Sequence, residues 1–317
     1  MIFGGNPVAS TKVARFVIQK PKSRLSRYGW APYIFVSPFF FLFGLFFLVP
    51  SLAALILSLF RWNGIGEIEW MGFANYEFIL SDSVFWQAVR NTLFYTATSV
   101  LVIMPLSLIL AVLLNAKSLR FATVWRAMYF TPVVVSTVAT SLIFQMLLNE
   151  NSGLLNAPLI ALGLEPIDWL GDRAFVKIAL IIVIGWRSFG LLTIDFLAGL
   201  QSIPVEIYEA AEIDGASMTQ RFFFVTIPLL KPIILFVSII VMLGSIQVFD
   251  EPRILTGGGP ANASITVVQY LYQRGFERLR FGFASSVGTI LFLVVFVVSF
   301  IQLRFFGTFR ADGDNLS

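Results

Sequence analysis

The sequence predicts an all-α polytopic membrane protein with six transmembrane helices. Hydrophobic residues make up 57% of the 317 residues and charged residues only 13%, a composition typical of membrane proteins. Six apolar stretches are long enough to cross a bilayer, which takes about 20 predominantly apolar residues. Lys and Arg gather in alternate connections between these stretches, as expected for a chain that crosses a membrane repeatedly.

The predicted spans follow one another along most of the chain, separated by polar connections. Their approximate bounds are Pro32–Phe60, Thr92–Leu114, Thr123–Leu148, Phe175–Leu200, Ile227–Phe249 and Phe283–Phe306. The first stretch is too long for the core of a signal peptide, and no small-residue cleavage site follows it, so we expect it to remain as a helix. Pro38 and Pro50 lie inside it and are expected to kink it or to be accommodated by packing.

The distribution of basic residues predicts that both termini face the cytoplasm. Residues 1–28 carry Lys and Arg but no acidic residue, and we assign them to a basic cytoplasmic tail. The connection after the second span is also basic, and an excess of Lys and Arg marks the cytoplasmic side of a membrane protein. The membrane domain then covers residues 29–310, and residues 311–317 form a short polar end. The fifth connection is the exception to the charge rule, because it places four arginines outside: Arg253, Arg274, Arg278 and Arg280.

Composition argues against several functions. The chain contains no Cys and no His, so thiol and imidazole catalysis, disulfides and the usual zinc sites are not expected. Paired carboxylates inside the spans are also lacking, which disfavours a membrane-embedded enzyme. No G-x-x-x-x-G-K-[ST] loop occurs, so we expect ATP hydrolysis, if it drives this protein, to come from another polypeptide. The net charge of +4 does not indicate nucleic-acid binding, because the basic residues follow membrane topology.

Residues 204–228 form a polar island between two strongly apolar segments. Pro204 separates the island from the preceding helix, because the residue before a proline avoids the α region, and Ser202 is the expected N-cap. Helix-forming residues continue to Ala211, and Gly215 predicts a helix end with positive φ. A second helix is expected at 217–224.

The island carries an acidic face made of Glu206, Glu209, Glu212 and Asp214. A helix that only rests on lipid would favour Lys and Arg on its polar face, because the cytoplasmic leaflet is anionic. We therefore predict that the island binds a soluble partner protein. A partner that pushes on this helix would move the two spans joined to it.

This island resembles the EAA motif of the binding-protein-dependent ABC importer permeases. The motif residues are Glu209, Ala210, Ala211 and Gly215, followed by the stretch 225–228. Other stretches are similar to the sugar-permease branch of maltose, lactose and glycerol-phosphate type: 91–93, 129–132, 153–156, 198–204, 248–250 and 255–260. The chain departs from the pattern at Val225, where Ile is commoner, and at 251–253, where apolar or aromatic residues are commoner.

The resemblance, which covers about residues 30–305, implies a type I importer permease fold and an alternating-access mechanism. The chain would be one permease half of an ATP-driven sugar importer in the bacterial inner membrane. The loop at about 202–228 would hold a coupling helix, whose Glu209, Ala210, Ala211, Asp214 and Gly215 contact a cytosolic ATPase. Two ATPase subunits would bind ATP and Mg²⁺, so this chain needs no cofactor. A second, related permease would complete a heterodimer, and an external solute-binding protein would deliver the sugar.

The resemblance also places the sugar contacts in the fourth and fifth spans. The candidate residues are Arg187, Ser188, Leu191, Asp195, Gly244, Ser245, Gln247 and Asp250. A charge near mid-membrane costs roughly 2.5–3.5 kcal/mol on insertion scales, so Arg187 and Asp195 are expected to face protein or water. Small, amide, aromatic and acidic side chains together suit a polyhydroxylated ligand. An ion pair between helices, or an arginine reaching the outer interface, stays open for the two charges, as does ordinary polar packing for Ser245.

The substrate and one alternative function stay open at this stage. Disaccharides, oligosaccharides, glucosylated glycerol and sn-glycerol 3-phosphate all fit, and a cavity lined by Arg187 would favour the phosphate. The alternative function is an ion-coupled secondary transporter, which would show inverted repeats, broken helices and acidic residues inside the membrane. Asp195 is the one acid that suggests it, and this alternative leaves the polar island without a role.

Overall fold

The computed structural model describes residues 30–116 and 119–311. The predicted basic tail, and all but the first residue of the predicted polar end, lie outside the described residues. Those described residues divide into two compact units, with the boundary between Leu52 and Ala53. The first unit consists of α1 (Ala31–Phe43), the π-helix η2 (Gly44–Leu48) and the start of α2 (Val49–Leu57). Its large apolar side chains are exposed along its length, as expected for a helix that meets lipid.

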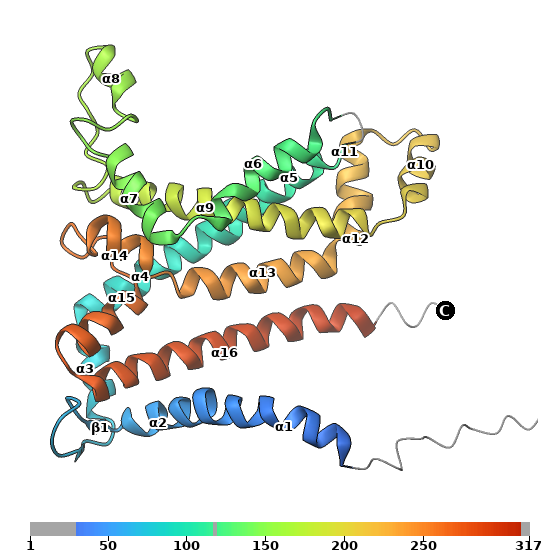
Figure 1. The fold of residues 1–317 in the computed structure, drawn as a ribbon. Helices are drawn as coiled ribbons and strands as arrows, with labels where there is room; N and C mark the ends of the chain where they lie inside the picture. Colours follow the sequence, from blue (N-terminus) through green and yellow to red (C-terminus); the bar gives the residue numbers. More distant parts are fainter. Residues whose placement is uncertain (1–29, 117–118, 312–317) are drawn as a thin grey trace, which may run out of the picture. The chain divides into compact units, whose positions relative to one another are not determined.

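The second unit begins with the end of α2, which is followed by a short hairpin and then by helices (Figure 1). Its first half contains β1 (Phe60–Arg61), β2 (Glu69–Trp70), α3 (Ala74–Ser81), α4 (Ser83–Thr98), η3 (Ser99–Ile103), α5 (Met104–Leu114), α6 (Ala122–Val134), α7 (Thr137–Leu147) and α8 (Ala157–Ala161). Its second half contains α9 (Phe175–Gln201), α10 (Val205–Ile213), α11 (Met218–Arg221), η4 (Phe222–Thr226), α12 (Ile227–Leu229), α13 (Lys231–Ile246), α14 (Asp250–Thr256), α15 (Val267–Tyr272), η5 (Gln273–Glu277) and α16 (Phe281–Ala311).

Five described helices are long and apolar enough to cross a membrane, and they correspond to five of the predicted spans. They are Pro32–Leu57, Ser83–Leu114, Phe175–Gln201, Lys231–Thr256 and Phe281–Arg304. The third predicted span is different, because α6 and α7 form a pair bent by 99°. Pro132 lies in the last turn of α6, and Ser136, just before α7, has an extended ψ of 135°. A proline removes a helical N–H and favours such a break, so the described residues hold five continuous spans and one bent pair.

Prolines also explain three of the π-helical turns. The segments η2, η3 and η4 each end two residues before a proline, namely Pro50, Pro105 and Pro228. A proline cannot donate to the carbonyl four residues earlier, and its ring crowds that carbonyl. A π turn widens the helix at this point, which lets the helix continue without a sharp kink.

The larger hydrophobic core lies where α4, α5, α9 and α13 meet. Its fully buried side chains include Tyr95, Leu180, Phe196 and Val237. Helices α5 and α6 both pack along α9 (Figure 1). On α9, a Cβ at Gly190 would collide with the backbone carbonyl of Tyr129, so glycine at this position lets α6 approach backbone to backbone.

A second core lies at the end of this unit opposite α10, between α3, α4, α15 and α16 (Figure 1). Residues of the sequence motifs hold the loops there. Asn91 donates from its amide to the carbonyls of Asn262 and Ile265 at 3.2 and 2.9 Å, and the Thr92 hydroxyl accepts from the Val267 N–H at 3.0 Å. These motif residues therefore tie the loop after α14 to α4.

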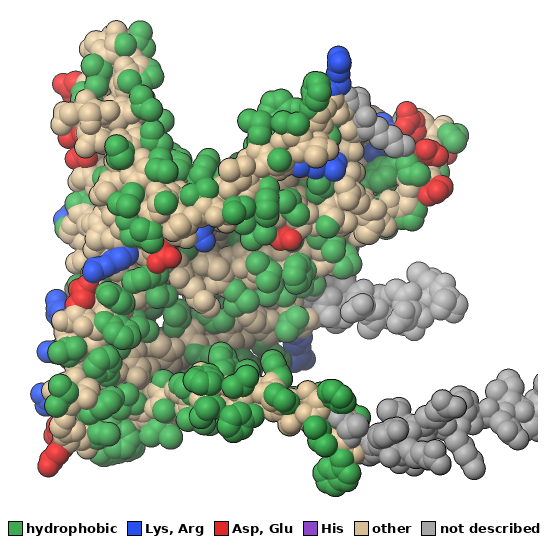
Figure 2. Space-filling view, viewed as in Figure 1, with side chains coloured by type: hydrophobic (Ala, Val, Ile, Leu, Met, Phe, Trp, Pro, Cys, Tyr) green, Lys and Arg blue, Asp and Glu red, His purple; other side chains and the backbone are tan. Residues whose placement is uncertain are grey.

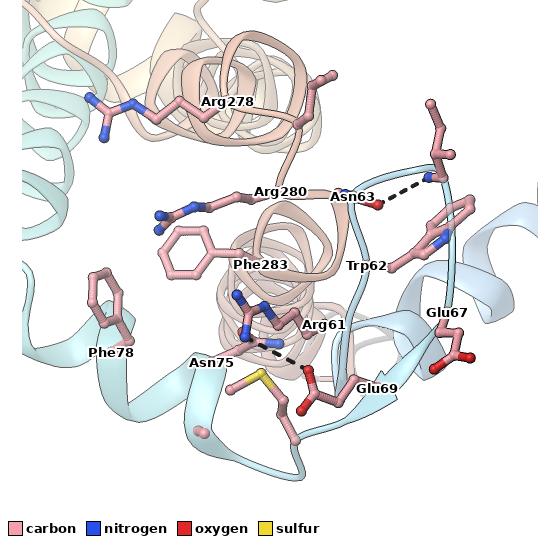
Figure 3. A pocket seen from close by; sticks show the side chains of 14 residues that line it. Arg61, Trp62, Asn63, Glu67, Glu69, Asn75, Phe78, Arg278, Arg280 and Phe283 are labelled. Atoms are coloured by element: carbon pink, nitrogen blue, oxygen red, sulfur yellow. Dashed lines mark hydrogen bonds and ion pairs between the residues drawn. The ribbon is translucent and has the colours of Figure 1, made fainter.

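The four arginines of the fifth connection divide into two kinds. Arg253 pairs with Glu277 at 2.7 Å, and Arg274 pairs with Asp82 at 2.7 Å. Arg278 and Arg280 line an open pocket of about 870 Å³ beside the β1–β2 hairpin. Figure 3 shows both of them reaching from the segment before α16, with Arg61 beside Glu69 on the hairpin. Half of the unexpected positive charge is thus compensated within the chain.

Candidate functional site: a helical loop and a cavity between the spans

The loop after α9 begins with a change from the sequence prediction. Ser202 does not cap α10; it ends α9 in a helical conformation, and its hydroxyl donates to the Gly199 carbonyl at 2.7 Å. The reason is that α9 runs one residue past the predicted end, to Gln201. Pro204 takes the N-cap position of α10 with ψ of 134° and no side-chain cap.

Gly215 ends α10 in the left-handed conformation that the sequence predicts, with φ of +79°. The Ala216 N–H donates to the Ala211 carbonyl at 2.9 Å, and the Gly215 N–H donates to the Glu212 carbonyl at 3.0 Å. This pair of bonds is the Schellman arrangement, which satisfies the last carbonyls of a helix. The chain therefore reverses direction within three residues of α10.

The second helix of the loop begins with a capping box. The Ser217 hydroxyl accepts from the Gln220 N–H at 3.3 Å, and the Gln220 side chain accepts from the Ser217 N–H at 2.8 Å. Each side chain satisfies an N–H that the first helical turn leaves unpaired. Helix α11 then continues into η4, so helical structure covers residues 218–224 of the predicted range, and Ser217 is the N-cap.

Two side-chain contacts hold the loop helices together. Arg221 pairs with Glu212 at 2.8 Å, and the hydroxyls of Tyr208 and Thr226 lie 3.1 Å apart. Glu209, Ala210, Asp214 and Gly215 are exposed, and Ala211 is half-buried. Beside them, the side chain of Ile213 is 87% exposed. Figure 2 shows acidic side chains gathered with apolar ones at the end that carries α10, so this end presents a mixed surface.

A cavity of about 310 Å³ lies between α9, η3 and the α13–α14 region. Seven of the eight predicted sugar contacts line it: Arg187, Ser188, Leu191, Gly244, Ser245, Gln247 and Asp250. The eighth, Asp195, does not line this cavity. It lies on α9 one turn beyond Leu191 toward α10, is half-buried, and has no hydrogen bond or ion pair within the described part of the chain.

Arg187 joins three elements at the wall of this cavity. Its Nη1 donates to the Glu251 carboxylate of α14 at 3.1 Å and to the hydroxyl of Thr137 at the start of α7. The Glu251 side chain is 9% exposed and that of Arg187 is 37% exposed. The sequence left open whether Arg187 contacts sugar, forms an ion pair between helices or reaches the outer interface. In the structure it forms an ion pair between helical elements and also lines the cavity.

Two polar or charged residues of the cavity lining, Glu251 and Ser99, are absent from the sequence prediction. Glu251 belongs to the stretch that departs from the sugar-permease pattern, and the need of an intramembrane arginine for an acidic partner is the signal that could have identified it. Ser99 of η3 also lines the cavity. Nothing in its local sequence distinguishes it from the other small polar residues of the second span. Gln145, a polar residue of the third predicted span, does not line this cavity; its amide donates to the Leu255 carbonyl at 3.4 Å.

A polytopic helical chain with an exposed helical loop at one end and a cavity between its spans has the architecture expected of a membrane transport subunit. Residues 103–308 match the family model described as "Binding-protein-dependent transport system inner membrane component". The chain belongs to this family, so the predicted resemblance is confirmed.

Individual relatives are similar over nearly their whole length. The lactose transport system permease protein LacF of Rhizobium radiobacter is 40% identical over 290 residues, covering 89% of this chain and 96% of LacF. The arabinooligosaccharides transport system permease protein AraP of Bacillus subtilis is 36% identical over 285 residues, covering 89% of this chain and 90% of AraP. These likenesses give no support to the ion-coupled alternative.

Solved structures show the same fold. The chain is similar to a chain of the bacterial alginate ABC transporter in complex with an alginate pentasaccharide-bound periplasmic protein. The TM-score is 0.79 at 22% identity, covering 88% of this chain and 94% of the other. This similarity confirms the predicted all-α importer permease fold.

Proposed function

We propose that this chain is one permease half of an ATP-driven sugar importer, with both termini in the cytoplasm of a bacterial cell. The observation that carries the proposal is the cavity. Seven of the predicted sugar contacts, from two different spans, line one cavity. A π-helical turn of the second span lines it with them. The names of the lactose and arabinooligosaccharide permeases support the same substrate class.

Coupling to ATP hydrolysis is assigned to α10 and the turn after it. The exposed surface of Glu209, Ala210, Asp214 and Gly215 would contact a cytosolic ATPase, with Ala211 packed at its edge. Because an ion pair joins α10 to α11 and a hydrogen bond joins it to η4, force on α10 would be transmitted to α13 rather than absorbed in a loose loop. Two ATPase subunits that bind ATP and Mg²⁺, a second permease and a solute-binding protein would complete the complex.

The mechanism is alternating access. When the ATPases close on ATP, the two coupling helices of the permease pair would approach each other and open the cavity outward. The solute-binding protein would then release sugar into it, and hydrolysis would reset the inward-open state. Each ligand shifts the equilibrium only by its difference in affinity for the two states.

Reversing the charge of Glu209 tests the coupling role. In proteoliposomes that contain the whole importer, we expect Glu209→Lys to abolish sugar uptake and the sugar-stimulated part of ATP hydrolysis. Lysine would place like charges together if a basic ATPase residue pairs with Glu209. The matched control is Glu165→Lys, the same reversal on an exposed residue far from α10 in the sequence, which should transport normally.

Two outcomes would contradict the proposal. The first is unchanged uptake in Glu209→Lys. The second is the failure of any ATPase to co-purify with the unaltered chain when the neighbouring transport genes are co-expressed. Labelling of a single cysteine placed at 213 would add an independent check, because the proposal requires it to react from the cytoplasmic side.

A further inference from the structure

We propose that Glu251 sets the charge selectivity of the cavity, so that it takes uncharged sugars and rejects anionic ones. The inference rests on the proposed function and names its substrate class. Arg187 would otherwise make the cavity suited to a carboxylate or phosphate, since guanidinium groups bind these anions with two parallel hydrogen bonds. Glu251 compensates the charge of that arginine from within the chain, through a hydrogen bond from Arg187 Nη1.

The geometry of the pair favours a stable contact between Arg187 and Glu251. Arg187 and Glu251 are 3.1 Å apart, and the glutamate side chain is only 9% exposed. Removing Glu251 would leave the charge of the partly exposed Arg187 without its partner, which is unfavourable. The hydroxyl of Thr137 is a further acceptor for the same guanidinium nitrogen. A ligand anion would meet a guanidinium whose charge a buried carboxylate already compensates.

The sum of charges around the cavity points the same way. Among the described residues that line it, Arg187 is the one cation, while Asp250 and Glu251 are both acidic. With all three ionised, the lining carries a net charge of −1, counted as one positive and two negative groups. An anionic sugar would lose part of its hydration and meet a negatively charged lining, and both effects are unfavourable.

An uncharged sugar meets suitable partners in the same space. The carboxylate of Asp250 accepts hydrogen bonds from hydroxyls, and the amide of Gln247 both donates and accepts. Both side chains belong to exposed residues, so they are available to a ligand. Leu191 and Phe249 add apolar surface to the lining, against which the C–H faces of a sugar ring can pack.

The test compares probes that differ by one carboxylate. The probes are lactose and arabinotriose, the alditol of each and the aldonic acid of each; the alditol is the neutral reference for the acid, because in both the reducing-end ring is open. Binding is measured by equilibrium dialysis on the complete importer in nanodiscs without its solute-binding protein, which removes the selectivity of that protein. We expect the unaltered importer to bind at least one neutral sugar, and to bind the aldonic acid about tenfold more weakly than the alditol.

In Glu251→Gln, Arg187 keeps its charge but loses its acidic partner. We expect the affinity for the aldonic acid, relative to that for its neutral reference, to rise about tenfold. This corresponds to one charge-assisted hydrogen bond. The double variant Arg187→Gln/Glu251→Gln should lose that gain. Glu251→Asp, which keeps the charge but shortens the side chain, should give an intermediate gain and serves if Glu251→Gln does not assemble.

Two controls separate pairing from net charge. Asp250→Asn removes one negative charge from the lining without releasing Arg187, and we expect a smaller gain than in Glu251→Gln. Glu277→Gln breaks the 2.7 Å pair with Arg253. This pair lies outside the cavity lining, so the ratio of the affinities for the acidic and the neutral probe should not change. An Asp250→Asn gain equal to that of Glu251→Gln would overturn the role of the pair.

Other outcomes also decide the question. Equal binding of an alditol and the matching aldonic acid by the unaltered importer would overturn the charge inference and leave the sugar-importer function standing. So would a gain that persists in the double variant. Binding of no sugar by any variant would instead overturn the proposed function, and the inference with it.

Discussion

The loop at residues 202–228 and the cavity differ in how far apart in the sequence their contacting residues lie. In the loop, Ser217 and Gln220 are three positions apart, and Glu212 and Arg221 are nine apart. In the cavity, Arg187 contacts Thr137 and Glu251, which lie 50 and 64 positions away. Local contacts determine the shape of the loop almost independently of the rest of the chain, whereas the cavity exists only when distant helices pack. The two regions should therefore respond differently to substitution.

The largest expected effect comes from Glu251→Ala. It should destabilise the protein by about 2–3 kcal/mol, somewhat less than the roughly 3–5 kcal/mol for a fully buried pair, because Arg187 stays partly exposed. The matched control in the loop is Glu212→Ala, which breaks a bond of 2.8 Å to Arg221 but on a side chain that is 69% exposed. That change should cost at most about 0.5–1 kcal/mol.

Denaturation of the two variants in nanodiscs checks this contrast. If both lose the same stability, burial does not distinguish the cavity pair from the loop pair. The double variant Arg187→Ala/Glu251→Ala gives a further check. It should recover part of the loss, because no charge is then left without a partner.

Asp82 combines both kinds of contact in one carboxylate. It caps α4 by accepting from the Val84 N–H at 2.9 Å, and it accepts from Tyr270 and Arg274 at 2.7 Å each. Burial acts to raise the pKa of this carboxyl, but the bonds from Tyr270 and Val84 and the charge of Arg274 together hold it below the ordinary value of 3.8. Burial and the bond to Asp82 raise the pKa of the Tyr270 hydroxyl.

Asp82→Asn should therefore cost about 1–2 kcal/mol at neutral pH. A carboxylate with a lowered pKa contributes stability that is fully present above the unfolded-state pKa and is lost as pH falls through the lower native value. The difference in melting temperature between the parent and Asp82→Asn should thus persist down to about pH 4 and shrink below it. A difference that stays constant down to pH 2 would show that the charge of Asp82 is not involved.

Gly215→Ala tests how strictly the loop depends on its own backbone. The φ of Gly215 is +79°, and no atom lies near the position that an added Cβ would take. The cost should therefore be the intrinsic penalty of the left-handed conformation, about 1 kcal/mol. Amide exchange in α10 should become faster while α9 stays protected. The control is Gly44→Ala, in a helical conformation with φ of −59° and open space around it. Equal effects of the two changes would exclude a backbone requirement at Gly215.

The smallest expected effect is that of Ser217→Ala. It removes one half of the exposed capping box and should cost about 0.5–1 kcal/mol. The effect should be confined to exchange of the first amides of α11, with Gln220 the most affected. Slower sugar uptake without any change in exchange would contradict a purely structural role for Ser217.

Much of the fold could be predicted because spanning helices are identified by long apolar stretches alone. The sequence predicts the bent pair α6–α7 as one span, because the stretch is also long and apolar enough to cross a membrane. Pro132 and the extended backbone at Ser136 interrupt it, and hydropathy contains no information on this break. The prediction that Ser202 caps α10 was wrong for a similar reason, because the end of α9 depends on where this long helix stops packing on its neighbours.

The turn at Gly215, the capping box at Ser217 and the positions of the five long spans follow from residues close together in the chain, because backbone conformation and hydrophobic transfer act over a few residues. The pairing of Arg187 with Glu251 does not, and neither does the separation of Asp195 from the cavity that its neighbours line. These depend on the rotation and crossing of packed helices, which bring side chains more than fifty positions apart within hydrogen-bonding distance. Short-range preferences therefore decided the elements and the loop, and long-range packing decided the charge of the cavity.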